Sequence, residues 1–115
     1  MGSSQLLCCG SVKLESLSMR WVVIFEDAPA MLEVRKKYEP AHLAYLQAHD
    51  VEILVAGGLR EAPGSVFVGG LWILEVISRE RAIDLVENDP YFVNGARSYK
   101  VLVWGKAFQD KQVVL

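Results

Sequence analysis

Four segments of this chain have the composition of β-strands, and they carry apolar residues on both faces. The segments are Arg20–Glu26, Val51–Leu59, Val66–Ile77 and Ser98–Trp104. Successive residues of a strand point to opposite faces, so a sheet with one face in water normally alternates apolar and polar residues. The first segment instead places Trp21, Val23 and Phe25 on one face and Val22 and Ile24 on the other. The sequence therefore predicts a sheet that is covered on both faces.

Two segments with a helical period separate these strands. Between Ala30 and His49, apolar residues recur at steps of three and four, at Met31, Val34, Tyr38, Ala41 and Tyr45. Pro40 lies inside this segment and predicts a kink or a restart of the helix, because it lacks a backbone donor.

The second helix is predicted over Arg79–Asn88, with Ser78 as its N-cap and Asp89-Pro90 as its end. Its apolar face consists of Ala82, Leu85 and Val86, and Tyr91–Gly95 is predicted as a loop or a single turn. The resulting order β-α-β-β-α-β is that of an α+β ferredoxin-like sandwich, in which both helices cover one face of an antiparallel sheet.

The helix-free face of that sheet requires its own cover. A second apolar sheet packed face to face is the simplest one, and two-fold homodimers are the commonest symmetric assembly. We therefore expect a homodimer through the sheet face, in which the two sheets form a dimeric α+β barrel.

Composition argues against several classes of partner. The formal net charge is −2 with no block of Lys or Arg, so we expect no nucleic acid. No apolar run reaches the roughly 18 residues that span a bilayer, so we expect no membrane partner and a cytoplasmic location. Cys8 and Cys9 are adjacent and have no His or acid at metal-ligand spacing, which indicates a reduced pair, no metal site and no cofactor.

Three parts are predicted along the chain. Residues 1–18 form an N-terminal leader or extension, 19–105 the α+β domain, and 106–115 a C-terminal tail. Met19 is a plausible natural start; alternatively, the leader is tied to a partner subunit.

Few polar residues in the domain suit chemistry. His42 and His49 lie two turns apart on the first helix, and His49 is interpreted as a cap at the helix end. Asp89 is either a helix stop or the carboxylate that orients His42, since a His–carboxylate pair is the smallest recurring acid/base unit. Neither residue alone distinguishes a structural role from a catalytic one.

Two glycine pairs lie in the predicted hairpin, at Gly57-Gly58 and Gly69-Gly70. They either leave space for a ligand or mark bulges and close backbone contacts. Neither pair has the spacing of a phosphate-binding loop.

Several of these motifs together resemble the YciI-like (YCII-related) family. They are His-Leu-Ala-Tyr-Leu from His42, Ile-Leu-Val-Ala-Gly-Gly from Ile53, Gly-Gly-Leu-Trp-Ile-Leu-Glu from Gly69, and Asn-Asp-Pro-Tyr from Asn88. The resemblance covers residues 20–105. It implies a dimeric α+β barrel of the ferredoxin-like fold, with an active site at the first-helix His and the Asp of Asp-Pro-Tyr.

Carried to this chain, the resemblance implies His42 and Asp89 as catalytic residues. It also implies a binding surface for a small-molecule ligand, with Arg35 available to an anionic group. That surface is expected to contain Arg35, Gly57, Gly58, Gly70 and Tyr91.

The chain departs from the family pattern at three positions. The residue after Ala-Gly is Gly58 rather than Pro, and the bend of the third strand has Gly70 where Ser is usual. The last strand ends in Trp104-Gly105 rather than Pro-Trp or Pro-Phe. The change at Gly70 removes a hydroxyl that could contact a ligand, which predicts an altered substrate or a loss of activity.

Three hypotheses follow for the function. The first is an enzyme of lyase, isomerase or dehalogenase type that uses the His42–Asp89 pair on a small polar, aromatic or enol-type molecule. The second is a non-catalytic ligand-binding or accessory module, in which both side chains are closed to solvent. The third is a purely structural protein, supported only by the leader and the apolar sheet face.

Overall fold

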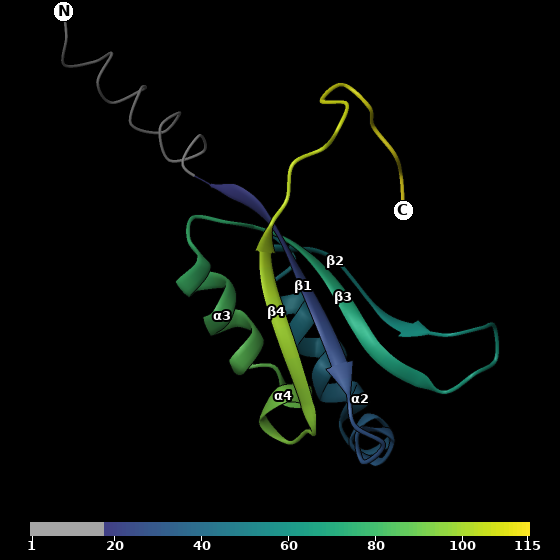
Figure 1. Ribbon diagram of the computed structural model, residues 1–115. Helices are drawn as coiled ribbons and strands as arrows, with labels where there is room; N and C mark the ends of the chain where they lie inside the picture. Colours follow the sequence, from purple (N-terminus) through teal and green to yellow (C-terminus); the bar gives the residue numbers. More distant parts are fainter. Residues whose placement is uncertain (1–17) are drawn as a thin grey trace, which may run out of the picture.

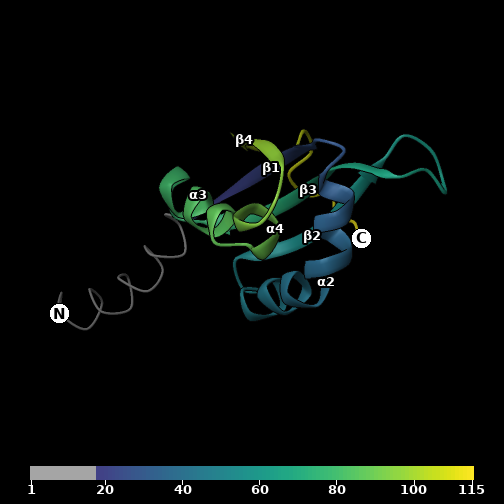
Figure 2. The same ribbon diagram turned by 90° about the horizontal axis from the view of Figure 1, so that it is seen from below.

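The computed structural model describes residues 18–115 and arranges them as a four-stranded antiparallel sheet with helices on one side (Figures 1 and 2). The strands are β1 (Met19–Asp27), β2 (Ile53–Arg60), β3 (Phe67–Val76) and β4 (Arg97–Val103), in the spatial order β2-β3-β1-β4. The helices are α2 (Met31–Ala48), α3 (Arg79–Glu87) and the single turn α4 (Pro90–Val93). This is the ferredoxin-like order, so the predicted α+β fold is confirmed.

The limits of α3 follow from local chemistry. The Ser78 hydroxyl accepts a hydrogen bond from the backbone N–H of Arg81 at 3.1 Å, which confirms the predicted N-cap. The predicted apolar face is fully buried, at Ala82, Leu85 and Val86.

Helix α2 differs from its prediction in two details. It continues through Pro40 without interruption, so the restart that was one of two expected outcomes does not occur. Pro40 is exposed, so water can reach the carbonyl group that its missing N–H leaves unpaired. Ala41, predicted for the apolar stripe, is exposed, and His42 faces inward in its place.

The core lies between the sheet and the helices. Its largest members include Val23, Phe25, Trp72, Leu74 and Leu85, each at most 2% exposed. The central strands β1 and β3 supply most of these large core residues. A central strand has another strand on each side, and helices cover one of its faces.

Gly69 explains one of the two glycine pairs. A Cβ atom at this position would overlap the carbonyl oxygen of Phe25 on the neighbouring strand, so the predicted close backbone approach is confirmed. The β2–β3 ladder also shifts register between Leu59 and Arg60, opposite the start of β3.

The helix-free face of the sheet is mainly apolar, as the alternation predicts, although the exposed Lys100 is the cross-strand partner of Ile24 on this face. Cross-strand neighbours on this face are Val22, Ile24, Leu71, Ile73 and Leu102. Ile24 of the central strand β1 is 39% exposed, and Leu102 of the edge strand β4 is 48% exposed. Such exposure is unusual for an apolar residue of a central strand.

Two predicted parts of the chain flank the domain. The predicted leader, apart from Ser18, falls outside the described residues, as do Cys8 and Cys9. Residues 106–115 form neither helix nor strand, and Val114 is 98% exposed. Within residues 18–115, no helix is long and apolar enough to cross a membrane.

Candidate active site

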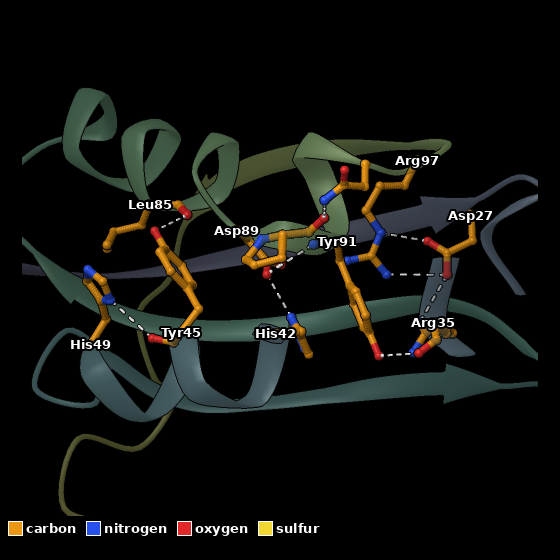
Figure 3. Close-up of polar contacts among 11 residues, drawn as sticks. Asp27, Arg35, His42, Tyr45, His49, Leu85, Asp89, Tyr91 and Arg97 are labelled. Carbon is orange, nitrogen blue, oxygen red and sulfur yellow. Dashed lines mark hydrogen bonds and ion pairs between the residues drawn. The ribbon is translucent and has the colours of Figure 1, made fainter. Parts of the chain in front are cut away.

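His42 and Asp89 meet where α2 packs beside α4 (Figure 3). The His42 Nδ1–H donates to Asp89 Oδ1 at 2.7 Å, although the residues are 47 positions apart in the chain. The His42 side chain is 12% exposed and lines a cleft, whereas Asp89 is fully buried behind it. With Nδ1 bonded to the carboxylate, Nε2 is the ring nitrogen left to exchange a proton.

The backbone at the start of α4 fixes the position of Asp89. Asp89 is the N-cap of this turn, and its Oδ1 also accepts from the backbone N–H of Tyr91 at 3.3 Å. Pro90 occupies the first position of the turn, where a missing N–H costs little. The Asp-Pro-Tyr sequence thus holds the carboxylate toward His42 by local geometry. Its Oδ2 is buried and has no hydrogen-bond partner among residues 18–115.

Tyr91 supports the His42 ring from one side. The two rings stack with centroids 3.7 Å apart and an interplanar angle of 7°. Tyr91 itself is buried, and this burial raises the pKa of its phenol. The ring therefore stays neutral, and its stacking restricts the orientation of the imidazole.

A second tyrosine lies one helical turn beyond His42. The Tyr45 hydroxyl donates to the carbonyl oxygen of Leu85 at 2.7 Å and so joins α2 to α3. Burial, and next the charge of Asp89, raise the pKa of Tyr45 to about 12. This phenol remains a donor at neutral pH, and its bond ties α2, which carries His42, to α3, which directly precedes Asp89.

Two arginines share one buried carboxylate at the other end of the site (Figure 3). Arg97 binds Asp27 through Nε and one terminal nitrogen at 2.8 and 3.2 Å. Arg35 donates to Asp27 at 2.9 Å and to the carbonyl oxygen of Gly69 at 2.8 Å. Tyr91 lies between this cluster and His42, since both guanidinium carbons are within 6 Å of its ring centre.

A cleft of about 670 Å³ joins these groups, a volume in the usual range for small-molecule sites. Arg35, His42, Tyr91 and Arg97 line it, with Phe67 and Trp72 as further aromatic walls. Its floor includes Gly57, Gly58 and Gly70 of the β2–β3 hairpin.

The structure places every predicted site residue in or beside this one cleft. His42 and the five predicted binding residues line it, and Asp89 lies directly behind His42. Their roles in catalysis and binding stay predictions. His49 lies apart, where its Nδ1–H donates to the Tyr45 carbonyl oxygen at 3.0 Å at the end of α2, as its interpretation as a cap expects.

Asp27 and Arg97 are not among the predicted site residues. Each lies at a strand end, where charged residues are normally solvated, yet their side chains are only 1% and 2% exposed. They are directly paired in the β1–β4 ladder, so only the strand register could have indicated them. Among residues 18–115, no three His, Cys, Asp or Glu side chains gather as metal ligands would.

Comparisons with known proteins agree with this architecture. The family model of the YCII-related domain matches residues 19–105. A solved structure with a TM-score of 0.68 and 30% sequence identity covers 76% of this chain and 94% of its own. It is 5-chloro-2-hydroxyhydroquinone dehydrochlorinase from Burkholderia phenoliruptrix AC1100 in complex with 2,5-dihydroxybenzoquinone. A search of curated proteins finds no match.

Proposed function

We propose that this chain, which belongs to the YCII-related domain family, is a small enzyme that moves protons on a small polar molecule of aromatic or enol type. The observation that carries the proposal is the 2.7 Å hydrogen bond between His42 and Asp89 at the wall of an open cleft.

In this proposal His42 is the general acid or base. Its Nε2 takes a proton from a hydroxyl or carbon acid in the cleft and returns it in a later step. Asp89 receives the Nδ1–H, holds the required tautomer and stabilises the imidazolium that forms. Tyr91 stacks on the ring and limits its rotation, so the same nitrogen faces each substrate.

The reaction type is lyase, isomerase or dehalogenase chemistry. The similar enzyme named above is a dehydrochlorinase of a chlorinated hydroxyhydroquinone. Loss of HCl requires only removal of a proton and departure of chloride, which one acid/base group can assist. The aromatic walls Phe67, Trp72 and Tyr91 suit a planar substrate.

Substitution of His42 by Gln tests the proposal. Gln keeps a donor for Asp89 but cannot exchange a proton, so we expect turnover to fall by at least about 100-fold. Hydroxylated quinones, chlorinated hydroquinones and enol lactones would be screened with the wild type first. His49→Gln is the matched control, because it changes the same residue type on the same helix outside the cleft. Equal turnover of wild type and His42→Gln on an identified substrate would refute the mechanism.

A non-catalytic ligand-binding module is the second candidate. The complete burial of Asp89 favours it, because a closed carboxylate is compatible with a purely structural hydrogen bond. The position of His42 in the cleft wall counts against it, because the module is expected to have both side chains closed to solvent. Ligand binding without turnover across the same screen would favour the module.

The proposal includes a homodimer in a cytoplasmic setting. The helix-free sheet face, with Val22, Ile24, Leu71, Ile73 and Leu102, would pack against the same face of a second copy. Two-fold packing buries the apolar side chains that one chain leaves exposed, including Ile24 and Leu102.

A further inference from the structure

We propose that the Arg35–Arg97 end of the cleft is an anion subsite that selects planar substrates carrying an ionised oxygen, either a carboxylate or an ionised enol. This inference rests on the proposed function, because it places the charged end of the substrate one ring away from His42. It goes further by assigning Arg97 and Gly70 to substrate selection.

The charge balance of the cluster is the first observation. Two guanidinium groups face the single carboxylate of Asp27, which leaves an excess of one positive charge. Arg35 and Arg97 have side chains only 15% and 2% exposed, so water screens this charge weakly.

The other charges lining the cleft do not offset this excess directly. Glu33 pairs with Lys36 at 3.6 Å, and both side chains are more than three-quarters exposed. Glu39 is an exposed residue of the same helix, and its charge and that of the buried Asp89 act on Tyr91, on the His42 side of the two arginines. The inner end of the cleft therefore favours an anion.

Unused hydrogen-bonding capacity is the second observation. Arg35 directs one terminal nitrogen to Asp27 and to the Gly69 carbonyl oxygen, while its Nε is buried without a partner. A buried donor without a partner is costly. Because Nε is closed to solvent, an anion in the cleft would stabilise this guanidinium through its charge and not through a hydrogen bond to Nε.

The paired glycines are the third observation. Gly58 and Gly70 are directly opposite each other in the β2–β3 ladder. A Cβ at Gly58 would lie 3.4 Å from a terminal nitrogen of Arg35, and one at Gly70 would lie 3.7 Å from a terminal nitrogen of Arg97. The same Cβ at Gly58 would overlap the Phe67 ring, and the one at Gly70 would lie 3.2 Å from the Gly57 carbonyl oxygen. A side chain at either position would therefore crowd the floor of the cleft beside the two guanidinium groups.

The position of Tyr91 connects this subsite to His42. One side of the ring stacks on the imidazole, and both guanidinium carbons lie within 6 Å of the ring centre. A planar substrate with its ionised oxygen near Gly70 would therefore present its ring to His42.

Binding of matched probes to the full chain tests the inference. Calorimetry would compare benzoate with benzamide, and 2,5-dihydroxybenzoquinone with its dimethyl ether. We expect the wild type to bind at least one anion about 10-fold or more tightly than its neutral counterpart. Tighter binding of benzoate identifies a carboxylate as the preferred group, and tighter binding of the dihydroxyquinone identifies an ionised enol.

Three variants localise the effect. Arg35→Gln should raise the Kd of the anion about 10- to 100-fold, while Lys36→Gln removes the same charge at the exposed rim and should change it about twofold or less. Gly70→Ala keeps every charge but adds a methyl group to the floor of the cleft, so it should also weaken anion binding about 10-fold. This variant provides the test if Arg35→Gln does not fold.

Equal affinity for anionic and neutral probes, or equal effects of Arg35→Gln and Lys36→Gln, would overturn the subsite. This failure is distinct from failure of the proposed function. An inactive protein that still selects anions keeps the subsite, and an active one that prefers neutral probes keeps only the catalytic proposal.

Discussion

Replacement of Asp89 by Asn isolates the charge of the buried carboxylate from its geometry. Asn is nearly the same size, and it is an equally good N-cap for α4. Its Oδ1 can still accept from His42 Nδ1 and from the Tyr91 N–H, which now lie at 2.7 and 3.3 Å. The substitution therefore removes the negative charge and leaves the two hydrogen bonds available.

The expected loss of activity follows from that charge. A hydrogen bond to a charged acceptor contributes about 1.5–3 kcal/mol, roughly twice a neutral one, and the imidazolium in the transition state adds Coulomb attraction in a buried setting. A loss of about 2–3 kcal/mol lowers kcat about 30- to 150-fold.

Stability should change much less. The Asn amide nitrogen replaces Oδ2, which is buried without a partner, so the fold exchanges one unsatisfied acceptor for one unsatisfied donor. A net cost of about 1 kcal/mol lowers Tm by about 4–8 °C for a domain of this size.

Steady-state kinetics on the identified substrate and thermal unfolding measure these two effects. Nitrogen NMR of the His42 ring gives a third readout without a substrate. It should show a proton on Nδ1 in the wild type and a mixture of tautomers in Asp89→Asn, because the Asn amide can also turn its N–H group toward Nδ1. Unchanged kcat together with an unchanged tautomer would show that Asp89 neither orients nor stabilises the imidazole.

Two further predictions concern assembly and pH. Ile24→Lys places a charge in the centre of the helix-free face, so it should convert the expected dimer to monomers of unchanged helix content. Light scattering measures the first effect and circular dichroism the second. A wild-type protein that is monomeric at the same concentration would contradict the dimer. The hydrogen bonds from Arg81 lower the pKa of Glu52 in the folded state, so this pair stabilises the fold above the ordinary Glu range and loses that contribution as pH falls through the lowered value. Glu52→Gln should therefore lower the free energy of unfolding by about 0.5–1 kcal/mol at pH 7 and by nothing near pH 2, and a difference that is independent of pH would contradict the ion pair.

The order and type of the elements could be predicted from local patterns. The period of two in Arg20–Glu26 and the period of three to four after Met31 depend only on which face each side chain occupies. Ser78 could be identified as a cap because its hydroxyl acts on a backbone N–H three residues away. Such short-range interactions can be recognised from the sequence because the interacting groups are also neighbours in the chain.

The candidate site was predicted in part for a different reason. His42 and Asp89 are candidates from sequence because they are residue types that move protons and because their motifs resemble a family. Their contact depends on how α2 packs against α4. The apolar stripe of the first helix also does not predict that His42 faces inward, because it assigns that direction to Ala41.

The sequence by itself determined the strands, the helices and a sheet with two apolar faces, since these follow from side-chain alternation and local capping. The tertiary structure alone decided that Asp27 and Arg97, 70 residues apart, are cross-strand partners and form the charged end of the cleft. In the sequence, these residues can be recognised only as charged residues at the ends of strands. Burial and a defined register turn the same charges into a buried ion pair, because pairing in a water-poor environment depends on distances that only the folded sheet sets.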